Sequence, residues 1–138
     1  MCHDRITIIF SCINSQQSYD IFLERPKIVV RPKLIEIKKP LRPAVFNCVA
    51  KGVPNPTIIW QKGNKVIGNN EIGNQLVYSG KRFHITTEGS LVIFDPRADD
   101  EDLYVCIAKN SVGSTLYRTN LYIDLSKCFF MCFRLTYV

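Results

Sequence analysis

The sequence predicts an all-β protein. Several runs alternate in side-chain type with a period of two, which is the period at which successive strand residues face the same side of a sheet. In three of these runs a cysteine or a tryptophan shares a face with apolar neighbours. Those faces are Phe46/Cys48/Ala50, Ile58/Trp60 and Tyr104/Cys106/Ala108. Turn signals such as Gly63-Asn64 and Glu88-Gly89 separate the runs, which favours several short strands over a few long ones.

The first half of the chain divides at its prolines. A strand is expected at 28–38 and is interrupted at Pro32, because proline lacks the backbone donor that a central strand needs. Residues 39–43 form a turn and 44–50 the next strand. Residues 51–56 form a loop that two prolines stiffen, and 57–62 form a further strand.

The second half is predicted from its turn signals. Residues 66–80 hold several glycines and asparagines and are read as a long loop with a short extended piece at 75–78. Strands at 81–86 and 90–94 flank Glu88-Gly89, and 95–102 form a crossing loop. A strand then runs to Lys109, 110–113 make a hairpin, and 114–125 form the last strand.

One set of spaced residues resembles a known family. The set is Cys48, Trp60, Leu91, Ile93, Asp100, Tyr104 and Cys106. It is similar to an immunoglobulin domain of the intermediate, or I-set, type, over about residues 27–125. The resemblance implies an immunoglobulin-like antiparallel β-sandwich with Greek-key connections and irregular terminal tails. It also implies a disulfide between Cys48 and Cys106, and a structural core of Trp60, Tyr104, Leu91 and Ile93.

The resemblance assigns two further structural roles. Arg82 lies where the family has a basic residue that pairs with an acid four residues before the tyrosine, which is Asp100 here. The Tyr104 hydroxyl is expected to bond back to the crossing loop as a tyrosine corner. Asp102 departs from the family, which has Gly or Ala there, so its side chain must point to water or the turn must adjust. The 39–43 turn also departs from the usual pattern.

At 138 residues the chain is long enough for one domain with tails, placed at 25–126. Residues 1–24 are left without an element: the apolar run after Arg5 resembles a weak secretory signal, and a disordered or wrongly assigned start is the preferred reading. Residues 127–138 form a short apolar tail, far below the roughly 20 residues of a transmembrane helix. We read it as the end of a fragment or gene model, with an anchor as the minority reading.

The sequence supplies little for catalysis. The histidines are His3 and His84, no phosphate-binding loop is present, and the acids at 99–102 are read as a solvated turn. The cysteines at 2, 128 and 132 lack the spacing of a four-ligand zinc site, so no metal and no cofactor is expected. The basic residues are not interleaved with stacking aromatics, which argues against nucleic acid. We expect no enzyme and no small-molecule substrate.

One face of the predicted sandwich is a candidate for protein contact. Ile59, Val105 and Ile107 point away from the core if the alternation holds. The candidates beside them on the last strand are Leu116, Arg118, Asn120 and Tyr122. Exposed apolar rows with tyrosine at the edge are typical of protein interfaces. The alternative is ordinary strand surface, because branched side chains suit solvent-facing strands without any partner.

A second candidate surface is basic. The formal charge of +6 is uneven, with ten Lys or Arg against two Glu over 24–65, and six acids against Arg97 over 86–102. The candidate basic edge consists of Arg25, Lys27, Arg31 and Lys33. A solvated edge that discourages strand addition is one reading. A sulfated glycan or an acidic neighbouring domain is the other.

The resemblance implies a non-enzymatic recognition or adhesion module. Such domains recur in neuronal adhesion and guidance receptors and in basement-membrane proteins, with homophilic or heterophilic domain contacts, so the expected location is extracellular or at the cell surface. Two alternatives stay open. One is an intracellular sarcomeric spacer of a giant muscle protein, with reduced cysteines. The other is an ectodomain fragment of a receptor kinase or phosphatase. Asn55-Pro56-Thr57 cannot accept an N-linked glycan because proline occupies its middle position, so it gives no indication of secretion.

Overall fold

The computed structural model describes residues 5–10, 19–38, 42–71 and 82–124. Within these ranges it contains strands and a single short 3₁₀ helix, η1. The elements are β1 Arg5–Phe10, β2 Tyr19–Val30, β3 Ile35–Ile37, β4 Ala44–Phe46, β5 Val49–Val53, β6 Thr57–Lys62, β7 Lys65–Asn69, β8 Phe83–Ile85, β9 Leu91–Ile93, η1 Ala98–Asp100, β10 Asp102–Asn110 and β11 Gly113–Ile123.

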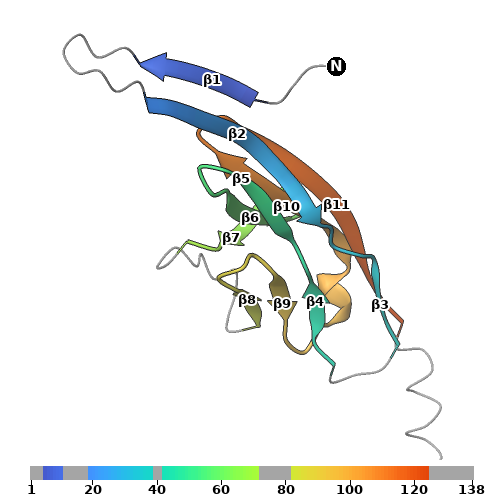
Figure 1. Ribbon diagram of the computed structural model, residues 1–138. Helices are drawn as coiled ribbons and strands as arrows, with labels where there is room; N and C mark the ends of the chain where they lie inside the picture. Colours follow the sequence, from blue (N-terminus) through green and yellow to red (C-terminus); the bar gives the residue numbers. More distant parts are fainter. Residues whose placement is uncertain (1–4, 11–18, 39–41, 72–81, 125–138) are drawn as a thin grey trace, which may run out of the picture.

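The strands form two layers (Figure 1). One layer is a five-stranded sheet in the order β3-β11-β10-β6-β7. The other consists of two three-stranded sheets, β1-β2-β5 and β4-β9-β8, joined because β4 and β5 follow each other with only Asn47 and Cys48 between them. The pairings are antiparallel except that of β3 with β11. This arrangement confirms the predicted immunoglobulin-like all-β sandwich.

The core lies between the two layers and follows the predicted alternation. Fully buried side chains come from both sheets, with Phe46 from β4, Trp60 from β6, Leu91 from β9 and Tyr104 from β10. Cys48, Cys106 and Ile93 are 0% exposed as well. Burying a large apolar side chain stabilises the folded state by about 1.5–3 kcal/mol, so this cluster is the main source of stability.

Three predicted elements differ from the structure. The predicted strand at 28–38 is two strands, since β2 ends at Val30 and β3 starts at Ile35 in the other layer. The predicted strand at 44–50 is interrupted between β4 and β5. The start of the predicted 66–80 loop is β7, which pairs with β6 through a register shift at Trp60/Gln61. Gly68 is buried there, opposite Trp60, so it packs in the sheet and does not mark a loop. Residues 75–78 lie outside the described residues.

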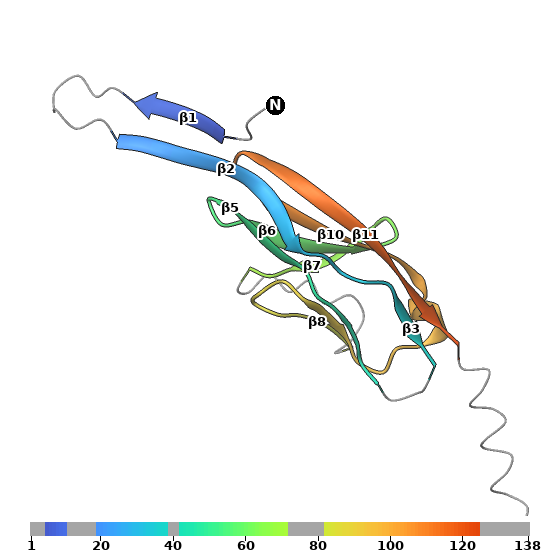
Figure 2. The same ribbon diagram turned by 45° about the vertical axis from the view of Figure 1, so that its right-hand side comes forward.

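The N-terminal segment holds a hairpin that the sequence did not predict. β1 pairs with the first half of β2, from Arg5 opposite Glu24 to Phe10 opposite Tyr19. The second half of β2 pairs with β5. Both views show β1 and the start of β2 lying beyond the end of the sandwich (Figures 1 and 2). Residues 127–138, and the cysteines at 2, 12, 128 and 132, lie outside the described residues. In the described ranges no helix has the length and apolarity to cross a bilayer.

Candidate functional site

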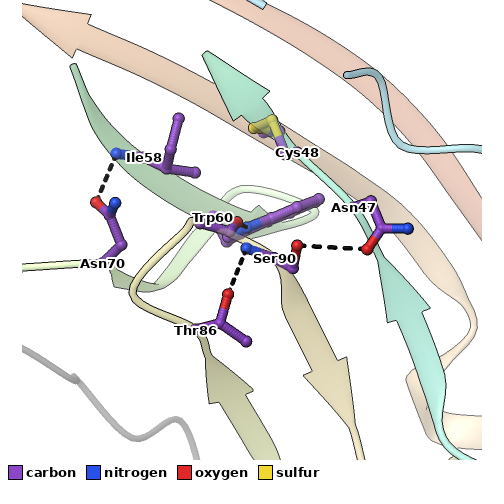
Figure 3. Close-up of a disulfide and its surroundings, with 9 residues drawn as sticks. Asn47, Cys48, Ile58, Trp60, Asn70, Thr86 and Ser90 are labelled. Atoms are coloured by element: carbon purple, nitrogen blue, oxygen red, sulfur yellow. Dashed lines mark hydrogen bonds between the residues drawn. A yellow bond between two sulfur atoms is a disulfide. The ribbon is translucent and has the colours of Figure 1, made fainter. Parts of the chain in front are cut away.

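The centre of the sandwich is a disulfide with an indole beside it. Cys48 and Cys106 are bridged, with their Cα atoms 6.6 Å apart, and Trp60 is opposite Cys106 in the neighbouring strand. Figure 3 shows Trp60 beside Cys48 of the bridge. The ring of Phe46 completes the cluster, with its centroid 5.9 Å from that of Trp60 and 5.1 Å from that of Tyr104. The structure thus brings together the residues expected around the bridge.

Gly89 fixes the orientation of the indole. The Nε1–H of Trp60 donates to the Gly89 carbonyl oxygen at 2.7 Å, so the polar atom of this buried ring is satisfied. Gly89 has φ of 103°, and a Cβ added there would lie 2.6 Å from Cγ1 of Ile58. Only glycine fits both conditions. The sequence marked Glu88-Gly89 as a turn but carried no signal for the contact with Trp60.

Asp100 is the centre of a charged cluster below the core. Arg82 donates to its Oδ2 at 2.6 Å and to its Oδ1 at 3.2 Å, and the Arg97 backbone N–H donates to Oδ2 at 2.8 Å. The Lys62 ammonium lies 3.8 Å from Oδ1. Burial of the carboxyl opposes ionisation, but the hydrogen bonds from Arg82 and Arg97 outweigh it and lower the pKa of Asp100. The hydrogen bond with Asp100 raises the pKa of Arg82.

Tyr104 ties the same region to the backbone. Its hydroxyl donates to the Asp100 carbonyl oxygen at 2.8 Å, which is the geometry expected of a tyrosine corner. Burial raises the pKa of Tyr104 far above its ordinary value, so the hydroxyl keeps its proton and remains a donor. Asp102, which departs from the family pattern, is exposed and accepts from its neighbour's N–H at Leu103, at 2.7 Å.

The outward face of the five-stranded sheet differs from its prediction at the centre. Val105 is only 5% exposed, so it is not the accessible contact residue that we expected. It points away from the core, but Gln61 and Arg118 lie directly opposite it on the flanking strands, close enough for their long side chains to cover it. Ile59 and Ile107 are half-buried.

The accessible apolar residues of this face lie around Val105. Leu116 is 44% exposed, Tyr122 49%, Val66 48% and Leu103 36%. They come from β11, β7 and β10, which are neighbours or near neighbours in one sheet. Of the predicted face, Leu116 and Tyr122 are therefore exposed, whereas Val66 and Leu103 were not among its candidate contact residues.

The predicted basic edge lies along β2 and the segment after it. Arg25, Lys27, Arg31 and Lys33 are all exposed. They do not form one strand row, because the pairing of β2 with β5 shifts register between Glu24 and Lys27 and between Ile28 and Val30. Arg25 and Arg31 reach toward β11. The Arg25 side chain lies 3.6 Å from where a Gly113 Cβ would be, and the Arg31 Cζ lies 5.5 Å from the Tyr117 ring centroid.

Asn110 is a structural residue that the sequence did not reveal. Its Nδ2 donates to the carbonyl oxygens of Glu24 at 2.8 Å and Pro54 at 3.0 Å, and its Oδ1 accepts from two N–H groups of the β10–β11 turn. One amide thus joins three chain segments. In the sequence Asn110 is only an asparagine at a hairpin, which is a common turn residue. Its role was missed because its partners are backbone carbonyls far away along the chain.

The comparisons with known proteins agree on one domain type. The family model described as "Immunoglobulin domain" matches residues 25–110. Human "Probable oxidoreductase PXDNL" is 36% identical over 81 residues, which cover 59% of this chain and 5% of that protein. Human protogenin is 32% identical over 106 residues, which cover 77% of this chain and 8% of that protein. The chain spans less than a tenth of the length of these curated relatives.

Solved structures show the same fold. Extracellular domains 3–5 of Drosophila OTK match with a TM-score of 0.63 at 26% identity, covering 84% of this chain and 38% of that one. A chain of the complex of titin M10 with obscurin-like 1 Ig matches with a TM-score of 0.59 at 21% identity, covering 71% of this chain and 92% of that one. At that identity the match shows the fold alone. On the sandwich, its bridge and the matched family model, this chain belongs to the immunoglobulin domain family.

Proposed function

We propose that this domain is a non-catalytic protein-recognition module of the cell-adhesion or guidance type, and that it contacts its partner through the outward face of the five-stranded sheet. The observation that carries the proposal is the exposure of Leu116, Tyr122 and Val66, each between 44% and 49%. Large apolar side chains grouped on one face mark protein contact sites more often than the same residues scattered singly.

The register of the sheet makes these residues part of a shared surface. Leu116 lies opposite Ile107, and Ile107 lies opposite Ile59, so a row of aliphatic side chains crosses three strands. Arg118 lies next along β11, opposite Val105. Protein interfaces favour this composition, in which tyrosine and arginine lie beside an aliphatic centre. Protein partners of the same domain type, homophilic or heterophilic, fit this face.

The disulfide supports a location outside the cytosol. Bridges form and persist in oxidising compartments, and Cys48–Cys106 is fully buried in the core. A matched structure is itself described as extracellular domains. We therefore place the domain in an extracellular or cell-surface protein, and prefer this to a sarcomeric spacer. In the described residues no group of three or more His, Cys, Asp or Glu is arranged to hold a metal ion.

The test replaces one exposed apolar residue by a charge on each side of the sandwich. Leu116→Glu changes the proposed face, and Val45→Glu changes a residue of matched exposure, 43%, on the opposite layer. Self-association is measured by sedimentation, and contact between surfaces by aggregation of beads coated with the domain. We expect Leu116→Glu to abolish association and Val45→Glu to preserve it, with circular dichroism showing that both fold. Equal behaviour of the two variants, or a wild type that does not associate in either assay, would remove the support for a homophilic contact on this face.

A further inference from the structure

A groove runs along one side of the sandwich between β2 and β11. β3 pairs with β11 only from Leu121 to Ile123, so the earlier part of β11 borders β2, which belongs to the other layer. Two hollows of about 650 and 420 Å³ lie along this border. Arg31 and Tyr117 line both hollows, so the two adjoin at these residues.

The walls of this groove are strongly basic. Arg25, Lys27, Arg31 and Lys33 come from the β2 side and Arg118 from β11, while Glu24 is the single acid among the lining residues. In the described part of the chain none of these five cations forms an ion pair. Unpaired cations along a concave surface raise the local concentration of anions.

The acidic end of the domain is only partly neutralised within the domain. Asp100 is buried with Arg82, and Asp95 is paired with Arg97 at 3.2 Å. Glu88, Asp99, Glu101 and Asp102 remain exposed. A second copy of the chain is therefore the competing occupant of the groove, and self-association that requires Arg25 and Arg31 in the absence of glycan would identify it.

The shape of the groove suits a linear ligand with repeated negative charges. Arg25 and Lys33 are eight residues apart in a largely extended segment, which corresponds to about 26 Å. The Arg25 and Arg31 side chains reach across toward Gly113 and Tyr117 and place guanidinium groups over the edge of β11. They obstruct the pairing of an added peptide strand with that edge and present forked donors, which bind oxyanions in pairs of hydrogen bonds.

We propose that the β2–β11 groove binds a linear sulfated glycan, with Arg25, Arg31 and Arg118 as its main contacts. The groove borders the outward face proposed for protein contact and shares Leu116 and Arg118 with it, whereas Arg25 and Arg31 belong to the groove alone. The sulfate groups of the glycan contact the guanidinium groups on both walls of the groove. Lys27 and Lys33 add positive charge on either side of Arg31. Binding is electrostatic for the most part and therefore weakens as salt is raised.

The experiment compares two double variants that remove the same charge. Arg25→Gln with Arg31→Gln changes the groove and leaves the outward face intact, and Lys65→Gln with Lys109→Gln changes two exposed cations on the five-stranded sheet. Binding of heparin oligosaccharides is measured by calorimetry, with chemically desulfated heparin and poly-glutamate as comparison ligands. Thermal unfolding checks that each variant folds, since Arg31 also lies over Tyr117.

We expect the groove variant to bind heparin oligosaccharides at least tenfold more weakly, and the matched variant to stay within about twofold of wild type. Desulfated heparin should bind far more weakly than heparin. Equal losses in both variants would show attraction to net charge alone and would overturn the site. Tighter binding of poly-glutamate than of heparin would overturn the glycan and identify an acidic polypeptide as the ligand of the groove.

Discussion

The indole N–H of Trp60 donates to the Gly89 carbonyl oxygen at 2.7 Å, across 29 residues of sequence, and this bond joins the central strand β6 to the turn before β9. It depends on a backbone conformation that glycine alone adopts readily, since φ at Gly89 is 103°. The turn therefore acts as part of the core.

Gly89→Ala is expected to destabilise the domain by at least about 2 kcal/mol. The added Cβ meets Ile58 at 2.6 Å, and a left-handed conformation costs a non-glycine residue about 1–3 kcal/mol. Gly113→Ala is the matched control, because its nearest neighbours lie at 3.6 Å in the flexible Arg25 side chain. Urea unfolding measures both. Similar losses in the two variants would contradict the assigned role of Gly89.

Reduction of the Cys48–Cys106 bridge is expected to lower the free energy of unfolding by about 2–5 kcal/mol. The bridge joins residues 58 apart, so its loss frees a long loop in the unfolded chain. Denaturation with and without reductant measures the effect. A variant with alanine at both positions should show no response to reductant. If that variant responds as the wild type does, the effect comes from other cysteines.

Asp100→Asn is expected to cost more than the roughly 1 kcal/mol typical of a surface ion pair. The Asp100 side chain is 3% exposed, and the change leaves the Arg82 guanidinium without its charged partner. Asp95→Asn is the control, since that pair with Arg97 is exposed and asparagine tolerates the positive φ of position 95. If Asp100→Asn left the free energy of unfolding unchanged, the ion pair with Arg82 would not be a source of stability.

The same carboxyl predicts a dependence on pH. The pKa of Asp100 is lowered on folding, so the unfolded chain takes up this proton first as pH falls. Its contribution is fully present above the ordinary aspartate pKa of about 3.9 and is lost as pH falls toward the lower folded value. The difference in unfolding free energy between wild type and Asp100→Asn should therefore stay constant down to about pH 5 and shrink as pH falls below about 4. A difference that stays constant or grows over that lower range would reverse the assigned sign.

Val105→Glu is expected to unfold or strongly destabilise the domain, whereas Leu116→Glu leaves it folded. Both residues face away from the core, but Val105 is 5% exposed and Leu116 is 44% exposed. A carboxylate at position 105 would be placed beneath its neighbours without a partner. Melting curves of the two variants compare them directly. If Val105→Glu were as stable as wild type, the side chains that cover Val105 would have to move aside at little cost.

The fold was predictable because its signals are local or nearly so. Alternation identified the inward faces that hold Cys48, Trp60 and Tyr104, and the family resemblance added the bridge and the partner of Asp100. The family match confirms that resemblance. β7 was missed because Gly68 and the asparagines around it read as loop residues, whereas its pairing with β6 depends on close packing against Trp60.

The surfaces were less predictable because exposure depends on neighbours in space. Alternation gave the direction of Val105 correctly, but its cover comes from side chains opposite it on two other strands. The basic edge was visible in the sequence as Arg25 to Lys33. Its second wall was not, because Arg118 joins it only through the packing of β11 beside β2. Asn110 gave no signal beyond that of a common turn residue.

Asn110 sets a boundary for local opening of the chain. Glu24 lies at the point where β2 changes partners, opposite Arg5 on one side and Val53 on the other, and its carbonyl oxygen accepts from the Asn110 amide. Fraying that starts from the β1 hairpin can proceed along β2 until it reaches the hydrogen bond between Asn110 and Glu24. Backbone amides before Glu24 should then exchange their hydrogens through small openings, while those within the β2–β5 ladder exchange only when the whole sandwich unfolds.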